Sequence, residues 1–362
     1  MQNLHNRRGD LGGGLLHKIS DESSYERIIS LENLLAAWKE FKRGKTRKPD
    51  VQEFDAALEE NLFEIHDALK RKTYHPALYV SFFVSDPKRR SIHKACVRDR
   101  VVHQALFRIL YPVFNRTFIH DSYSCRLGKG THRGVRQLAR YLRIVSGNHS
   151  RNTYALKCDI RKFFENIDHA LLVGLIEKRI HNTDTRELVR KIIDSFAVSK
   201  GSPYSTCSKV GLPLGNVTSQ LFSNIYLNEF DQWAKHVLKA HHYLRYCDDF
   251  IILHSDAGYL CAIVPLIQKT LHEKLKLALH PHKVSITKIR QGVDFLGYVA
   301  LPHATMVRTS SKNRMFRKLQ EKKKLVQKGV ITKESFNHSR QSYLGLLTHA
   351  NTQKLREQVK AL

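Results

Sequence analysis

Apolar residues near the N-terminus recur at three- and four-residue steps, the spacing of one face of a helix. The first run comprises Leu31, Leu34, Leu35, Trp38 and Phe41. A second run follows Pro49 and comprises Phe54, Leu58, Leu62, Ile65 and Leu69. Residues 25–72 are therefore predicted to form two helices whose apolar faces pack into a core.

Strand-like and helical patterns alternate along the rest of the chain. Strands are predicted from Tyr74 to Ser91, over 154–160, as a hairpin over 243–254, and near 283–300. Helices are predicted over 98–119, 162–180 and 216–240, near 259–278, and from 308 onward. Strands and helices mixed in this order indicate an α+β fold and not a doubly wound parallel sheet.

Composition adds a strong basic excess to this picture. The 362 residues include 61 Lys and Arg against 33 Asp and Glu, a formal net charge of +28. Nucleic acid is the first candidate partner, because basic proteins release counterions when they bind phosphate. No apolar run approaches the roughly 20 residues of a membrane span. With no signal-peptide core and no CxxC pair among six cysteines, the chain is expected to be cytosolic and without zinc knuckles.

Two segments place carboxylates at the ends of predicted strands. Asp159 ends the strand over 154–160, where a helix N-cap is the alternative role for a lone Asp. Asp248 and Asp249 stand between two apolar strands, which predicts a hairpin with both carboxylates at its tip. Such a pair is costly to bury unless a divalent cation screens it. Together the three carboxylates predict a Mg²⁺ site for nucleotidyl transfer.

The motifs around these carboxylates resemble those of reverse transcriptases. LKCDIRKFFENIDHALL resembles their first catalytic motif, RYCDDFIIL their YxDD motif, and VDFLGYV the segment that grips the primer end. SIHKACVRDRVVHQALFRILYPVF and SYSCRLGKGTHRGV resemble fingers motifs of group II intron-type enzymes. The resemblance implies a right-hand polymerase with an antiparallel palm sheet. Its implied parts are a helical N-terminal extension (1–73), fingers (74–153 with 175–210), palm (154–174 and 211–300) and a helical thumb (301–362).

The resemblance also implies roles for single residues. Asp159, Asp248 and Asp249 would be the catalytic carboxylates and would bind two Mg²⁺ ions, or Mn²⁺, together with the backbone carbonyl of Ile160. Phe164, five residues after Asp159, lies where a bulky side chain excludes ribonucleotides, with core packing as the alternative. The remaining nucleotide contacts would come from Lys88, Arg90, Arg126, Gly215 and Gln220.

Basic residues are concentrated in the segment 306–330, with apolar residues between them. Charge around most of a helix suits a thumb that lies along the backbone of a cDNA/RNA heteroduplex. A solvated surface helix is the alternative interpretation. The nucleic-acid contacts predicted here are Arg314, Arg317, Lys318 and Lys322.

The stretch GLPLGNVTSQLFSNIYLNEFD resembles the family's middle motif, which packs on the template and the incoming nucleotide, but it departs from the usual group II pattern. Leu214 stands before Gly215 where most such enzymes have Gln, and Gln220 follows Ser219 where they have Pro. LPLGNVTSQ and the late stretch SYLGLLTHANTQKL are similar to reverse transcriptases of diversity-generating retroelements. This likeness implies copying of a template RNA from dNTPs into adenine-mutagenic cDNA, in a bacterial, phage or archaeal cytoplasm. A pentameric accessory variability protein is the implied partner, and no membrane is involved. A retron or phage-defence enzyme and a non-catalytic, RNA-binding maturase-like protein are the alternatives.

Overall fold

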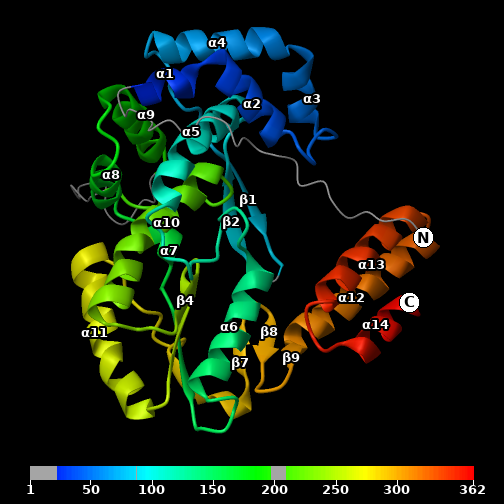
Figure 1. The fold of residues 1–362 in the computed structure, drawn as a ribbon. Helices are drawn as coiled ribbons and strands as arrows, with labels where there is room; N and C mark the ends of the chain where they lie inside the picture. Colours follow the sequence, from blue (N-terminus) through cyan, green and yellow to red (C-terminus); the bar gives the residue numbers. More distant parts are fainter. Residues whose placement is uncertain (1–22, 87, 197–208) are drawn as a thin grey trace. The chain divides into compact units, whose positions relative to one another are not determined.

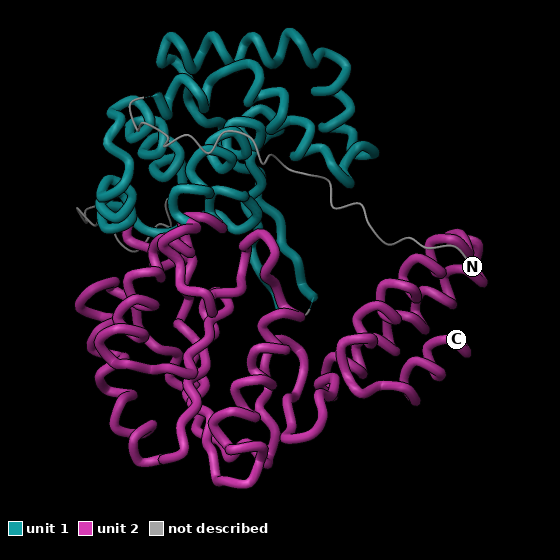
Figure 2. The backbone as a smooth tube through the Cα atoms, viewed as in Figure 1, with its two compact units in different colours: residues 1–114, 169–219 teal, residues 115–168, 220–362 magenta. Residues whose placement is uncertain are grey.

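The computed structural model describes residues 23–86, 88–196 and 209–362, and Figure 1 shows their helices and strands. The chain forms two compact units, coloured separately in Figure 2. Unit 1 comprises residues 1–114 and 169–219, and unit 2 comprises residues 115–168 and 220–362. Each unit combines two stretches of the sequence, because the backbone passes between the units three times. The four-part division into extension, fingers, palm and thumb stays a prediction.

Unit 1 begins with four helices where the apolar spacing predicts two. They are α1 (Ser24–Ile29), α2 (Leu31–Phe41), α3 (Pro49–Ala56) and α4 (Leu58–Lys70). Ser30 starts a new helix because its hydroxyl accepts a hydrogen bond from the backbone N–H of Asn33 at 3.2 Å. The predicted apolar faces do meet: the rings of Trp38 and Phe54 lie 4.8 Å apart and both residues are buried.

The rest of unit 1 contains three further helices and a hairpin. The helices are α5 (Val97–Asn115), α8 (His169–Glu177) and α9 (Thr183–Asp194). The strand predicted from Tyr74 to Ser91 is found as an antiparallel pair, β1 (Val80–Val84) and β2 (Arg90–Lys94). Every residue of β1 is exposed, whereas four of the five residues of β2 are partly buried.

Unit 2 is built on a four-stranded antiparallel sheet. Its strands are β3 (Tyr154–Asp159), β4 (Tyr243–Tyr246), β5 (Asp249–His254) and β6 (Ser285–Lys288), in the order β4-β5-β3-β6. Strand β3 lies inside the sheet and pairs with both β5 and β6. The predicted hairpin over 243–254 is β4 and β5. Helices mixed with antiparallel sheets confirm the α+β prediction.

The prediction of one continuous helix over 162–180 is wrong, because the structure has two helices there. α7 spans only Phe163–Asn166, and α8 starts at His169. Between them, Asp168 is buried and its carboxylate binds the Lys276 ammonium at 2.6 Å. The Asp168 backbone N–H also donates to the Tyr226 hydroxyl at 3.3 Å. These two contacts hold the linker outside a helix at the point where the chain leaves unit 2.

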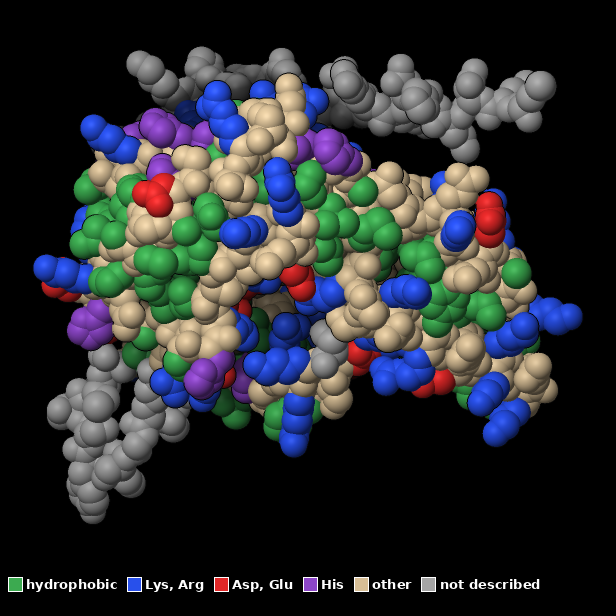
Figure 3. All heavy atoms as spheres, turned by 90° about the horizontal axis from the view of Figure 1, so that it is seen from below, with side chains coloured by type: hydrophobic (Ala, Val, Ile, Leu, Met, Phe, Trp, Pro, Cys, Tyr) green, Lys and Arg blue, Asp and Glu red, His purple; other side chains and the backbone are tan. Residues whose placement is uncertain are grey.

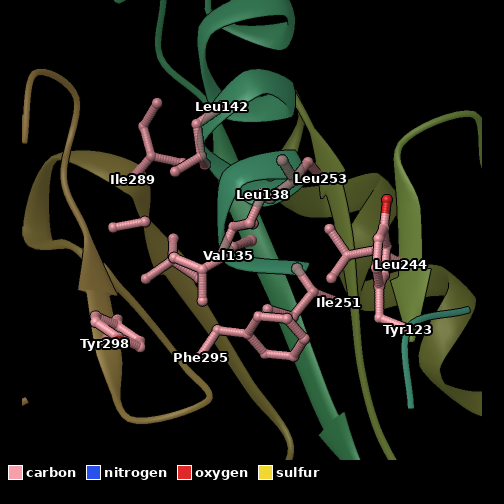
Figure 4. Packing of buried hydrophobic residues seen from close by; sticks show 13 residues of the cluster. Tyr123, Val135, Leu138, Leu142, Leu244, Ile251, Leu253, Ile289, Phe295 and Tyr298 are labelled. Atoms are coloured by element: carbon pink, nitrogen blue, oxygen red, sulfur yellow. The ribbon is translucent and has the colours of Figure 1, made fainter. Parts of the chain in front are cut away.

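Four helical segments belong wholly or partly to unit 2 and support its sheet. They are α6 (Thr131–Val145), α10 (Val217–Gln232), a π-helical turn (Trp233–Val237) and α11 (Ala257–Leu275). Residues 249, 251 and 253 share one face of β5, since side chains alternate along a strand. On that face α6 packs Val135, Leu138 and Leu142 against Leu244, Ile251 and Leu253 (Figure 4). Helix α6 therefore covers the sheet face from which Asp249 projects.

A second, three-stranded sheet extends this core. Its strands are β7 (Val293–Phe295), β8 (Tyr298–Ala300) and β9 (Thr305–Val307), joined in that order. Phe295 and Tyr298 are buried in the same cluster as the inner face of α6 (Figure 4). The hairpin β7–β8 carries the predicted primer-grip segment.

The C-terminal region is helical, as the sequence predicts. It consists of α12 (Thr309–Gln327), α13 (Lys333–Leu347) and α14 (Gln353–Lys360). A small core of its own contains Met315, Leu319, Phe336, Leu347 and Val359.

The molecular face in Figure 3 shows many Lys and Arg side chains and few Asp or Glu. None of the described helices is long and apolar enough to cross a membrane.

Candidate active site

A tight turn at the end of the unit 2 sheet carries two of the predicted carboxylates. Strand β4 ends at Tyr246, which pairs with Asp249, the first residue of β5. Cys247 and Asp248 form the turn between them, and Cys247 has the left-handed φ of 56°. Two-residue hairpin loops favour such left-handed conformations because they match the twist of the strands. The sequence therefore predicts the position of this turn correctly.

Strand register brings the third carboxylate to the same place. Asp159, the last residue of β3, lies directly opposite Asp249 on β5. The backbone N–H of Ile160 donates to the carbonyl oxygen of Asp248 at 3.2 Å, which ties the two strand ends together. The structure thus gathers Asp159, Asp248 and Asp249 at one end of a single sheet.

The electrostatics of this cluster resist full ionisation. Burial, together with the neighbouring charge of Asp159, raises the pKa of Asp248 above its ordinary value. Burial also raises the pKa of Asp249, and the charges of Asp248 and Asp159 act in the same direction while Lys157 opposes them. The ammonium of Lys283 lies 2.8 Å from Oδ2 of Asp159 and neutralises part of the charge. A further cation would stabilise the ionised cluster.

The donor atoms suit a hard divalent cation. Within the described ranges, no three His, Cys, Asp or Glu side chains stand in a ready-made metal-binding arrangement. Carboxylate oxygens and a backbone carbonyl are nevertheless the ligands that Mg²⁺ accepts, with substrate phosphates completing its shell. The two partly buried carboxylates with raised pKa values, Asp248 and Asp249, fit that role. The metal-binding roles of Asp159, Asp248, Asp249 and the Ile160 carbonyl stay predictions.

Arg245 supports the turn, and the sequence analysis missed it. Its side chain is fully buried in β4, and its guanidinium donates to both carboxylate oxygens of Asp231 at 2.8 and 2.6 Å. It also donates to the carbonyl of Cys247 at 3.0 Å, immediately before Asp248. The hydroxyl of Tyr243 binds the same Asp231 carboxylate. A charged residue at a buried strand position needs such a partner. An Arg within the apolar strand over 243–246 is therefore the sequence signal that would have identified Arg245.

Lys283 is the second residue that the sequence analysis missed. It precedes β6, and its contact with Asp159 joins residues 124 positions apart in the chain. No local spacing connects the two segments. They are brought side by side by the pairing of β3 with β6 and by the His280 backbone N–H, which donates to the carbonyl oxygen of Asp159 at 2.8 Å.

Two neighbouring phenylalanines in α7 have different environments. Phe163 is buried, whereas Phe164 is only partly buried. Their rings meet edge to face with centroids 5.2 Å apart. Of the two, Phe164 is the ring with a solvent-accessible surface that an incoming nucleotide could contact. Its role as a steric gate stays a prediction.

The other predicted nucleotide contacts are divided between the two units. Lys88, Arg90 and Gly215 belong to unit 1, and both cations are exposed there. Gln220 is an exposed residue of α10 in unit 2. Arg126, also in unit 2, donates to Oδ1 of Asn115 and to the carbonyls of Ile119 and Ser122. Arg126 therefore braces its own loop, and the nucleotide-binding roles stay predictions.

The predicted nucleic-acid contacts lie on α12. Arg317 is exposed and lies 3.7 Å from Glu321, while Arg314 and Lys318 are partly buried. Lys322 donates to the hydroxyl of Ser339 on α13. Lys322 thus joins two helices of the C-terminal core, and the binding roles of all four residues stay predictions.

A family model described as reverse transcriptase (RNA-dependent DNA polymerase) matches residues 85–300, which include all three aspartates. The chain belongs to the reverse transcriptase family. This confirms the family that the sequence motifs indicate. The matched region, here called the reverse transcriptase domain, covers more than half of the 362 residues.

Relatives of this reverse transcriptase domain include group II intron proteins. Protein YkfC of Escherichia coli K12 is 26% identical over 255 residues, with 62% of this chain and 66% of that protein covered. The group II intron-encoded protein LtrA of Lactococcus lactis is 24% identical over 309 residues, with 67% and 50% covered. The chain thus spans about half the length of LtrA. A telomerase structure from Candida albicans with a fragment of telomeric RNA aligns at a TM-score of 0.48 and 10% identity, over 79% of this chain and 60% of that chain.

Proposed function

We propose that this protein is an RNA-directed DNA polymerase that extends a primer with dNTPs on a template RNA. The observation that carries the proposal is the meeting of Asp159, Asp248 and Asp249 at one sheet end within the reverse transcriptase domain. Two bound divalent ions would activate the primer 3′-hydroxyl and neutralise charge on the leaving pyrophosphate. Three carboxylates supply the negative charge that would hold such ions.

The residues around the carboxylates have supporting tasks in this proposal. Asp159 and Asp249 are fixed by strand pairing, so their separation does not depend on a mobile loop. Arg245 holds the backbone just before Asp248. The ring of Phe164 would occupy the space that a ribose 2′-hydroxyl needs, and so would favour deoxynucleotides. Catalysis of this kind depends chiefly on positioning and charge neutralisation.

Primer extension on poly(rA)/oligo(dT) with Mg²⁺ tests the polymerase proposal. We expect Asp248→Asn to reduce incorporation by about 100-fold or more, the effect of removing one preorganised charged group. Asp256→Asn is a matched control, because Asp256 is an exposed N-cap of α11 and should leave extension unchanged. No incorporation by the wild type, or equal incorporation by the Asp248 variant, would reject the proposal.

We further propose that the enzyme serves a diversity-generating retroelement and makes errors at template adenines. The support is the sequence departure at Leu214 and Gln220, which flank Gly215 and the start of α10. A changed protein surface beneath the nascent base pair would allow mismatched nucleotides to be incorporated more often. Converting Leu214 to Gln and Gln220 to Pro should lower misincorporation opposite adenine and leave other template positions unchanged. Sequencing of the cDNA measures the error rate at each template base, and an unchanged rate opposite adenine would contradict this proposal.

This subtype implies a pentameric accessory protein and a cytoplasmic host compartment, which we also propose. Co-purification with RNA and any small basic protein, followed by cDNA sequencing, tests the partner. A retron or phage-defence enzyme would instead yield cDNA of its own linked RNA. The likeness to LtrA favours one further candidate, an RNA-binding maturase-like role. A protein that binds intron RNA tightly but extends no primer would support that candidate.

A further inference from the structure

Helix α6 carries four arginines along one exposed face. They are Arg133, Arg136, Arg140 and Arg143. Their spacing of three, four and three residues places them on one side of the helix. The opposite side is apolar and packs into the core of unit 2 (Figure 4). We call these four residues the arginine stripe.

The arginine stripe has no acidic counterpart. The sequence of α6 contains no Asp or Glu. Within the described part of the chain, no carboxylate lies within ion-pair distance of any of the four guanidinium groups. By contrast, the exposed Arg71 and Arg190 in unit 1 pair with Asp67 and Glu177. Four uncompensated charges on one face create a positive field that a polyanion would neutralise.

A pocket of about 570 Å³ lies at the C-terminal end of the stripe. Its polar lining comes from three places in unit 2 and includes Arg140, Arg143, Asn148, His149, His303 and Asn351. The rings of His149 and His303 meet nearly edge to face, with centroids 4.7 Å apart. This volume is in the range of pockets that take a small organic ligand. A volume of this size has room for a single unstacked nucleotide.

The stripe leads from the candidate active site to this pocket. At the start of α6, the hydroxyl of Thr131 donates to the hydroxyl of Tyr246 at 3.3 Å, next to the YCDD turn. Near the end of α6, the ring of Tyr141 lies 5.0 Å from His242, which precedes the opposite end of β4. The stripe is about 15 Å long, since a helix rises about 1.5 Å per residue.

We propose that the arginine stripe and its pocket bind a single-stranded segment of RNA outside the copied duplex. Arginine pairs with phosphate through two parallel hydrogen bonds, so the stripe suits a phosphodiester backbone. Unstacked RNA bases stack on histidine rings and guanidinium planes, both of which line the pocket. The side-chain amides of Asn148 and Asn351 offer N–H donors for a 2′-hydroxyl or a base edge, while Oδ1 of Asn351 accepts from the Thr305 backbone N–H at 2.9 Å. The inference rests on the proposed function for its biological setting.

Salt-dependent binding of a fluorescent oligo(U) RNA tests this inference. The test variant is Arg140→Gln/Arg143→Gln. Each single-strand phosphate contact contributes about 0.7 to the slope of log affinity against log salt, so losing two should reduce the slope by about 1.4. Extension of a short, preformed RNA/DNA primer–template should stay at the wild-type rate.

The matched control is Arg71→Gln/Arg190→Gln, which removes the same charge from arginines that have acidic partners. Its slope for oligo(U) should stay close to that of the wild type. An unchanged slope in the test variant, or an equal drop in the control, would overturn the inference and leave only a general charge effect. An equal loss of duplex extension would also overturn it, by assigning the stripe to the copying channel. A reduced slope in a protein that extends no primer would support the stripe and reject the polymerase proposal.

Discussion

Single side chains at the YCDD turn show what strand alternation can and cannot predict. Alternation and the β-rich flanks suffice to put Asp159, Asp248 and Asp249 at strand ends, and the register brings them together. Arg245 was missed because its partner Asp231 lies on a neighbouring segment, and Lys283 because its contact depends on the sheet order. The positions of the carboxylates can thus be predicted from the local sequence pattern, whereas the cationic side chains beside them are identified only from the tertiary structure.

Replacing Arg245 should separate its effect on stability from its effect on catalysis. Arg245→Met leaves the buried Asp231 unpaired and should lower the free energy of unfolding by about 3–5 kcal/mol, measured by urea denaturation. Arg245→Met/Asp231→Leu removes both charges and should recover much of that loss. The double variant should still have a reduced kcat with little change in KM, since the Cys247 carbonyl has lost its donor. A double variant with the kcat of the wild type would contradict the positioning role.

Phe164 and Phe163 form a natural pair of test and control. Phe164→Ala should increase incorporation of ribonucleotides relative to deoxynucleotides by about 10- to 100-fold, the discrimination that one pocket contact provides. Phe163→Ala should lower stability by about 3–5 kcal/mol because it leaves a cavity, with sugar selection unchanged. Competition assays with both nucleotide types measure the ratio. A shift in both variants, or in neither, would argue against a specific gate.

At the scale of elements, periodicity predicts where helices and strands lie better than where they end. The apolar faces of α2 and α4, the hairpin β4–β5 and the basic helix α12 follow the predicted patterns. The break between α7 and α8 does not, because it depends on the Asp168–Lys276 pair across 108 residues of sequence. A similar limit applies to the split of the N-terminal helices, where one serine cap outweighs continuous apolar spacing.

Gly215 tests the loop that leads into α10. Its φ of 117° is a conformation that side chains disfavour, and an added Cβ would lie 3.1 Å from Cγ2 of Ile92. Gly215→Ala should therefore cost about 1–3 kcal/mol of stability. Gly174→Ala is the matched control, because Gly174 is exposed in α8 with open space around it and should gain about 0.5–1 kcal/mol. Equal thermal shifts in both variants would show that the loop does not require glycine.

At the scale of the whole molecule, composition predicts the class of partner but not the path of the chain. The net charge of +28 indicates nucleic acid before any motif is considered. Nothing in the composition or the periodicity predicts that residues 169–219 join residues 1–114 in one unit. That arrangement follows from long-range contacts such as the hydrogen bond between Ser24 and Thr185 in unit 1.

The charge excess leads to a steep salt dependence. If the protein contacts six to ten phosphates of a primer–template, its affinity should fall by about 10³- to 10⁵-fold between about 50 and 200 mM salt. Fluorescence anisotropy with an RNA/DNA duplex measures the slope, and a free-nucleotide ligand serves as the control of low phosphate number. A shallow slope of log affinity against log salt for the duplex would mean that most of the Lys and Arg side chains contact no phosphate.

The three passages of the chain between the units have a consequence for biosynthesis. Unit 1 has all of its residues once residue 219 is added to the growing chain, while residues 220–362 of unit 2 are still to be made. At cellular translation rates the interval lasts on the order of ten seconds. At the start of that interval β3 has been synthesised, but β5 and β6, its two neighbours in the sheet, have not. The strand that carries Asp159 thus has neither of its pairing partners when unit 1 is complete, which leaves its edges open to other strands.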